Sequence, residues 1–188
     1  EVSFKWHQKA ADNGISNAQL AIGMGYQLGL LGEKNGPKAV SWIVKAADQD
    51  LVNAQVVLAN IFSNGIEGVT KDGKVAVKWY RKAAENGNAH AQVETGLRYQ
   101  YGNNVEEDQK AAVEWFQKAA KQENPKGQYY LALAYGKGAG ISRDLEEAVR
   151  LYKLVSLSED REFAAFASKD LLIIKEILQS GVAKDFKS

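Results

Sequence analysis

The side chains that most often carry catalysis or bind metals are few in this sequence. It has two histidines, His7 and His90, and no cysteine. Neither histidine has a histidine or cysteine partner three or four residues away, the spacing at which one helix presents two such ligands to a metal ion. His90 stands at the start of a predicted helix, and we expect it to be a solvent-facing polar residue. The sequence predicts no catalytic, metal-binding or cofactor-binding residue.

Two other patterns resemble binding sites but have simpler explanations. Gly136–Gly140 has the composition of a phosphate loop, yet it lies between two predicted helices and lacks the preceding strand and the Gly-Lys-Ser/Thr ending that such loops require. The acidic groups Glu106–Asp108 and Glu146–Glu147 lead into predicted helices, whose dipoles favour negative charge at their starts. We interpret the first as a linker and the others as helix starts.

Composition indicates an ordinary folded, soluble protein. Of 188 residues, 45% are hydrophobic and 25% charged, and 24 basic against 23 acidic residues give a net charge of +1. This balance favours neither nucleic acid nor an anionic membrane as partner, and no apolar run approaches the ~20 residues of a membrane helix. The sequence starts at Glu1 without a leader, so we expect a processed protein or a fragment. Compartment stays undetermined, with export favoured.

Four tryptophans recur at a regular spacing and reveal a repeat in the sequence. Trp6, Trp42, Trp79 and Trp115 are spaced by 36, 37 and 36 residues, and Leu151 follows 36 residues later. Each tryptophan is followed, after two intervening residues, by the sequence Lys-Ala-Ala. A fixed period of this length is typical of a tandem repeat. We expect all four tryptophans to lie in the core.

A second block recurs with the same period. It contains a glutamine, then a small residue, an aromatic residue and a glycine. The glutamines are Gln19, Gln55, Gln92 and Gln128, and the glycines are Gly29, Gly65, Gly102 and Gly138. A ligand would hardly be bound identically in every repeat, so we expect each glutamine to form a structural hydrogen bond to the neighbouring inter-repeat turn.

Both blocks have the apolar spacing of amphipathic helices. We name the helix of the glutamine block helix A and that of the tryptophan block helix B. Glycine suits the end of helix A because it adopts the left-handed conformation readily. A polar side chain stands where each helix B begins and is expected to cap it. These capping residues are Asn35, Asp72, Asp108 and Asp144.

The recurring pattern closely resembles the Sel-1-like repeat, a relative of the tetratricopeptide repeat. The resemblance covers residues 1–158, and the period of 36 to 37 exceeds the ~34 of the tetratricopeptide repeat itself. It implies an all-α fold: a right-handed α-α superhelix, or solenoid, of tandem helix-turn-helix repeats with a C-terminal capping helix. One repeat cannot bury its own apolar stripe, whereas stacked repeats can.

The period also predicts the division of the chain. The expected segments are a truncated repeat with helix B only (1–14), four repeats (15–50, 51–87, 88–123 and 124–158), and capping helices with a tail (159–188). Phe163 to Leu178 is expected to form one or two closing helices.

The resemblance implies an interaction scaffold or adaptor, in bacteria often at envelopes, in secretion or at host contacts. Two alternatives stay open. The chain could be a regulatory or targeting module of a larger enzyme or of an envelope or secretion assembly, or a structural spacer. The expected partner is a protein or peptide, with no nucleic acid, no membrane insertion and no cofactor, and the expected state is a monomer.

The partner is expected on the helix A face opposite the packing stripe. If Ala91, Thr95, Gly96 and Tyr99 point into the stack, helical geometry places a mixed polar, tyrosine and aliphatic strip on the other side, which is concave in tetratricopeptide-like superhelices. Val93, Leu97 and Leu133 have the alternative interpretation of inner core. The predicted partner-binding residues are Asn53, Asn60, His90, Glu94, Leu97, Tyr101, Lys126 and Tyr130.

Overall fold

The computed structural model describes residues 2–179, with side chains from residue 4 onward. This part of the chain forms ten α-helices, and its only strand pairing is one isolated bridge between Ile66 and Val69. The all-helical prediction is confirmed. The helices are α1 (Val2–Asp12), α2 (Ser16–Leu28), α3 (Gly36–Asp48), α4 (Val52–Asn64), α5 (Gly73–Glu85), α6 (Ala89–Tyr101), α7 (Gln109–Lys121), α8 (Pro125–Lys137), α9 (Leu145–Ser156) and α10 (Arg161–Gln179).

Helices α3, α5, α7 and α9 begin at the predicted polar caps. The side chain of each capping residue accepts a hydrogen bond from a backbone N–H group of the first turn, at 2.9 to 3.0 Å. These bonds satisfy donors that an uncapped helix leaves without a partner. The caps are Asn35, Asp72, Asp108 and Asp144.

The turns between repeats share one backbone conformation. Gly14, Asp50, Gly87 and Glu123 stand at equivalent places and have positive φ angles of 87°, 60°, 89° and 58°. Glycine adopts this region at little cost, whereas a residue with a Cβ atom is strained there. The turn is therefore fixed by the repeat architecture, and two of its four occurrences carry a residue poorly suited to it.

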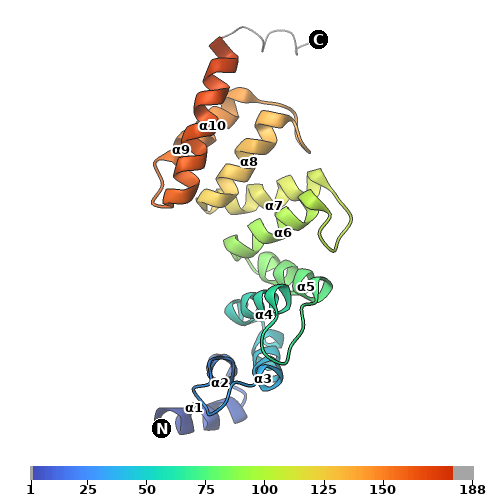
Figure 1. Cartoon of the computed structure of the whole chain (residues 1–188), viewed down its shortest axis with the longest axis vertical. Helices are drawn as coiled ribbons and strands as arrows, with labels where there is room; N and C mark the ends of the chain where they lie inside the picture. The colour runs from blue at the N-terminus through green and yellow to red at the C-terminus, as the bar shows by residue number, and fades with distance from the viewer. Residues whose placement is uncertain (1, 180–188) are drawn as a thin grey trace. The chain divides into compact units, whose positions relative to one another are not determined.

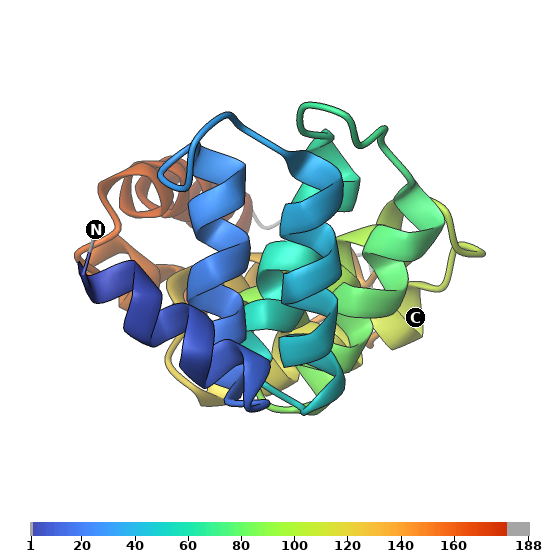
Figure 2. The same cartoon turned by 90° about the horizontal axis from the view of Figure 1, so that it is seen from below.

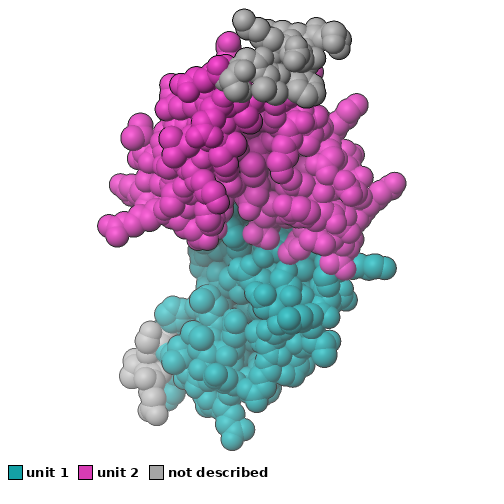
Figure 3. Space-filling model, turned by 45° about the horizontal axis from the view of Figure 1, so that its top comes forward, with its two compact units in different colours: residues 1–91 teal, residues 92–188 magenta. Residues whose placement is uncertain are grey.

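Two compact units divide the chain, Glu1–Ala91 and Gln92–Ser188 (Figure 3). In the first unit, helices contact their neighbours in chain order from α1 to α5, and Figure 2 shows α2 and α3 side by side. In the second unit, α8 contacts α7, α9 and α10, and α9 also packs on α10 (Figure 1). Each unit is built by stacking successive helix pairs.

Small residues let the two helices of a pair approach closely. A Cβ atom added to Gly23 of α2 would collide with the side chain of Ile43 in α3. A Cβ atom added to Gly96 of α6 would lie 2.5 Å from the ring of Phe116 in α7. Phe116 is 1% exposed and Ile43 fully buried, so the missing side chains are what allow these residues to pack.

The tryptophan prediction is correct for one residue and wrong for another. Trp79 is 8% exposed, whereas Trp6 is 68% exposed. Trp42 is half-buried and packs on a cluster formed by α1 and α2. Within residues 2–179, no helix precedes α1 to stand in that position relative to Trp6. Trp115 is half-buried, and the ammonium group of Lys118 lies 3.9 Å from its ring centroid.

Helix α10 closes the described part of the second unit. Its nineteen residues form a single helix, whereas the sequence left one or two helices open. Phe163, Ala167 and Ile174 are buried along one side of it, against a cluster that includes Leu151 and Val155 of α9. The predicted tail, residues 180–188, lies outside the described residues.

Candidate partner-binding surface

Tyrosines on α6 and α8 dominate the predicted face in the second unit. Tyr101, the last residue of α6, is 62% exposed. Tyr130 of α8 is half-buried, with its ring stacked on Phe116 at 5.3 Å and edge-on to Phe163 at 6.0 Å. Burial raises the pKa of Tyr130, and its electrostatic interactions with Tyr101 and with the carboxylate of Glu94 add to the effect. Tyr101 is thus the accessible member and Tyr130 a partly structural one.

A partly buried hydrogen bond connects α10 to this surface. The Tyr129 hydroxyl donates to Oδ2 of Asp170 at 2.8 Å. Burial, followed by this bond, raises the pKa of Tyr129, and burial does the same for Tyr152 of α9. Tyr129 also meets Phe166 of α10 with ring centroids 6.1 Å apart, and Phe166 is 44% exposed. Helix α10 therefore extends the aromatic surface of α8.

The other predicted residues of the second unit are largely engaged within the protein. Glu94 lies 4.0 Å from Arg98 in the same helix. Leu97 is half-buried against the core cluster. The ammonium group of Lys126 lies 5.2 Å from the ring centroid of Phe163. Val93, for which an inner-core role was the alternative, is 1% exposed and belongs to the core.

The predicted residues of the first unit differ in accessibility. Asn53 of α4 is exposed. Asn60, two turns later, is half-buried and accepts a hydrogen bond from the Tyr80 hydroxyl at 2.5 Å. His90 is exposed as predicted, and its ring meets Tyr80 edge-on at 6.4 Å. Tyr80 therefore fixes Asn60 from α5, and this contact between distant residues could not be inferred from the repeat pattern.

The recurring glutamines form a structural ladder, which confirms the prediction for Gln19 and Gln55. Both are buried, and each donates its side-chain N–H to a carbonyl oxygen near the end of the preceding helix B, that of Ala11 or Ala47, at 3.2 Å. The side-chain oxygens of Gln19, Gln55 and Gln92 each accept a hydrogen bond from the side-chain amide of the residue that ends the following helix B. These amide-to-glutamine pairs are Gln49 to Gln19 (2.8 Å), Asn86 to Gln55 (3.1 Å) and Gln122 to Gln92 (2.8 Å).

Sequence reasoning missed part of the accessible apolar surface. Met24 and Leu28 on α2 are 40% and 57% exposed, and they occupy the same helix A face as Asn60 and Asn64 one repeat later. Aligning the repeats position by position could have found them. Phe166 was missed because α10 lacks the glutamine that marks the other A helices.

A helix long and apolar enough to cross a membrane does not occur within residues 2–179. Across the same residues, no three histidine or acidic side chains are grouped as they would be around a metal ion.

The stacked helix pairs, with a fixed period, repeated caps and a repeated glutamine ladder, define an all-α solenoid repeat protein. The sequence profile of the Sel1 repeat matches residues 1–15, 16–51, 52–88, 89–124 and 125–154. The chain belongs to the Sel1 repeat family. No match to the chain was found among curated proteins.

Solved structures of Sel1 repeat proteins share the fold. A Sel1 repeat protein from Oxalobacter formigenes is 35% identical, with a TM-score of 0.75 over 82% of this chain and 63% of that one. A protective antigen of uropathogenic Escherichia coli, c5321, is 27% identical, with a TM-score of 0.55 over 93% and 44%. Helicobacter pylori cysteine rich protein B is 18% identical, with a TM-score of 0.53 over 69% and 92%. The chain therefore spans less than two thirds of the first two proteins.

Proteins of the Sel1 repeat family are generally protein-interaction scaffolds and typically not catalysts.

Proposed function

We propose that this chain is a non-catalytic scaffold of bacterial origin that binds a peptide or protein on the exposed faces of its A helices. The observation that carries the proposal is Tyr101, a large amphipathic side chain left 62% exposed beside the aromatic cluster of α8 and α10. Tyrosine is enriched at protein interfaces because its ring can be buried against a partner while its hydroxyl stays hydrated.

The surrounding charges support a polar partner. The carboxylates of Glu94 and Glu162 contribute to the raised pKa of Tyr130. The ammonium group of Lys126 lies over the ring of Phe163, which contacts Tyr130. An aromatic centre with charged residues around it is the usual anatomy of a protein interface. In the first unit, Asn53 and His90 offer exposed hydrogen-bonding groups on the same type of helix face.

A quantitative pull-down from a lysate of the source bacterium tests the proposal. We expect at least one protein to be retained by the full chain and by Lys153→Ala, a control on the exposed side of α9, but reduced at least about tenfold by Tyr101→Ala. Because the half-buried ring of Tyr130 packs against the core, Tyr130→Phe is the appropriate second variant, removing only its hydroxyl. Equal losses with Tyr101→Ala and with the control, all variants being folded, would contradict the proposal.

A further inference from the structure

One core position of the A helices is polar in α6 and apolar in α2, α4 and α8. Thr95 of α6 is 1% exposed, and its hydroxyl group makes no hydrogen bond with the described part of the chain. A buried hydroxyl without a partner costs free energy, because it has given up its hydrogen bonds to water. The equivalent residues are Ile22, Leu58 and Leu131, which are 0%, 0% and 6% exposed.

The same difference recurs one turn later in α6. Arg98 occupies that position, with its side chain 15% exposed and 4.0 Å from the carboxylate of Glu94. An ion pair held this far out of water adds little net stability, because the desolvation of both groups offsets their attraction. The equivalent residues of α2, α4 and α8 are Gly25, Ile61 and Ala134, all of them buried and uncharged.

Gln100 adds a third polar group to the same half of α6. Its side-chain oxygen is buried and accepts no hydrogen bond from the described residues. Residues 95–101 therefore contain polar side chains at two positions where the other A helices bury apolar or small ones, and a further buried polar atom beside them.

The backbone ends of these helices are alike, so the difference lies in the side chains. The N–H group of Asn103, just after α6, donates to the Arg98 carbonyl oxygen at 2.9 Å. The ends of α2 and α8 have the equivalent hydrogen bonds, from Leu30 to Gly25 at 2.9 Å and from Ala139 to Ala134 at 3.1 Å. All three helices end with the backbone satisfied in the same way.

We infer that the C-terminal half of α6, residues 95–101, opens locally while the rest of the chain stays folded, and that the partner-binding face around Tyr101 is lost whenever it opens. Leu97 and Tyr101, two of the predicted partner-binding residues, lie in this half. Local opening is most frequent in segments that bury the fewest apolar contacts. The inference rests on the scaffold function proposed above and adds a conformational step to it, because a partner bound to the closed helix holds it closed.

Amide hydrogen exchange of the full chain without a partner, followed residue by residue by NMR, tests the inference. After correction for intrinsic rates, the amides of residues 98–101 are expected to exchange at least about tenfold faster than those of residues 61–64, at the equivalent positions of α4. Helix α4 is the appropriate reference because Leu58 and Ile61 are 0% and 2% exposed.

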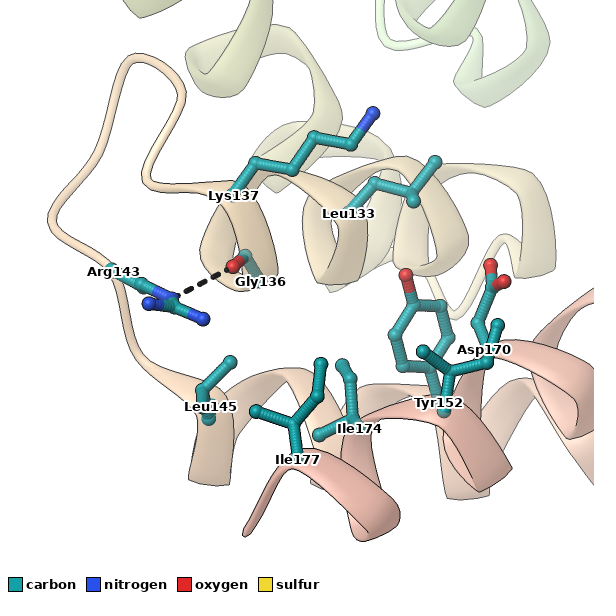
Figure 4. Close-up of a pocket in the computed structure, with 10 residues that line it drawn as sticks. Leu133, Gly136, Lys137, Arg143, Leu145, Tyr152, Asp170, Ile174 and Ile177 are labelled. Atoms are coloured by element: carbon teal, nitrogen blue, oxygen red, sulfur yellow. Dashed lines mark hydrogen bonds between the residues drawn. The ribbon is translucent and has the colours of Figure 1, made fainter. Parts of the chain in front are cut away.

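The end of α8 is a less suitable reference. Gly136 lies in its last turn, and a glycine inside a helix weakens it. The same residue lines a pocket of about 270 Å³ between α8, α9 and α10 (Figure 4). Both features would affect exchange there for reasons unrelated to buried polar groups.

Thr95→Val isolates the effect of the buried hydroxyl group. Valine has the shape and the β-branch of threonine, so helix propensity changes little. We expect the variant to slow exchange of residues 98–101 about fivefold or more and to leave residues 61–64 unchanged. Thr70→Val is the matched control, because Thr70 is exposed and lies outside the helices, and it is expected to change neither segment. The converse variant Leu58→Thr should accelerate exchange of residues 61–64.

Three results would overturn the inference. These are equal exchange of residues 98–101 and 61–64, unchanged exchange of residues 98–101 in Thr95→Val, and equal slowing by Thr70→Val. Failure of the scaffold function is distinguishable, because the pull-down with Tyr101→Ala tests binding, whereas exchange is measured on the chain alone.

Discussion

Replacing Gln55 by methionine tests whether the buried glutamine ladder holds the repeats together. Gln55 is fully buried, and its side-chain N–H donates to the Ala47 carbonyl oxygen at 3.2 Å. Its side-chain oxygen accepts from Asn86 at 3.1 Å. These two hydrogen bonds connect α4 to the end of α3 and to the end of α5, and the Gln55 N–H also makes a longer third bond, to Oδ1 of Asp50 at 3.4 Å. Methionine has a similar length and no amide, so the change removes all three bonds without opening a large cavity.

The expected loss follows from the state of each former partner. The Ala47 carbonyl keeps a hydrogen bond from the backbone N–H of Asp50 at 3.1 Å, so it is not left unsatisfied. Asn86 is exposed and can bond to water instead. Asp50 keeps its ion pair with Lys82 at 3.0 Å, so the long third bond adds little. Each of the two shorter hydrogen bonds then contributes its net value of about 1 kcal/mol. We expect Gln55→Met to lower the free energy of unfolding by about 2 kcal/mol.

Urea denaturation followed by far-ultraviolet circular dichroism measures this loss. A double-mutant cycle with Asn86→Ala should give a coupling energy of about 0.5–1.5 kcal/mol. Gln128→Met is a matched control, because Ser158 stands where the other repeats have a capping amide and its hydroxyl group makes no hydrogen bond with the described residues. We expect the control to cost less than about 1 kcal/mol. The ladder argument fails if the two methionine variants are equally destabilised, or if the coupling is zero.

Three further predictions concern packing and turns. Trp79→Ala should lower the free energy of unfolding by about 3–5 kcal/mol, the cost of truncating a buried aromatic, and a loss below about 1 kcal/mol in urea would contradict its burial. Glu123→Gly should raise the melting temperature, gaining about 0.5–1 kcal/mol, because residue 123 has positive φ where Gly87 stands in the preceding repeat; a lower melting temperature would refute the strain. Gly96→Ala should cost about 1–2 kcal/mol in urea because its Cβ meets Phe116, whereas a gain would show that the helices separate easily.

The predicted binding residues show where sequence reasoning stopped. The repeat pattern assigned Asn53 and Asn60 to one helix face, and helical periodicity is sufficient for that. It could not show that Tyr80, twenty residues later, donates to Asn60 and leaves Asn53 as the accessible residue of the two. Nor could it separate Tyr101, which is exposed, from Tyr130, which stacks on Phe116. Such differences depend on contacts between helices.

Sequence by itself determined the helices, their caps and their period, because these depend on local geometry and on a pattern repeated every 36 or 37 residues. Only the tertiary structure decided which residues at the same position of the repeat also have the same surroundings. Trp6 and Trp79 share a sequence context but not a neighbouring helix pair, and burial is set by that neighbour. Gly136 appears as one more glycine in the sequence, and only the folded chain places it beside Ile174 of α10, in the lining of a pocket.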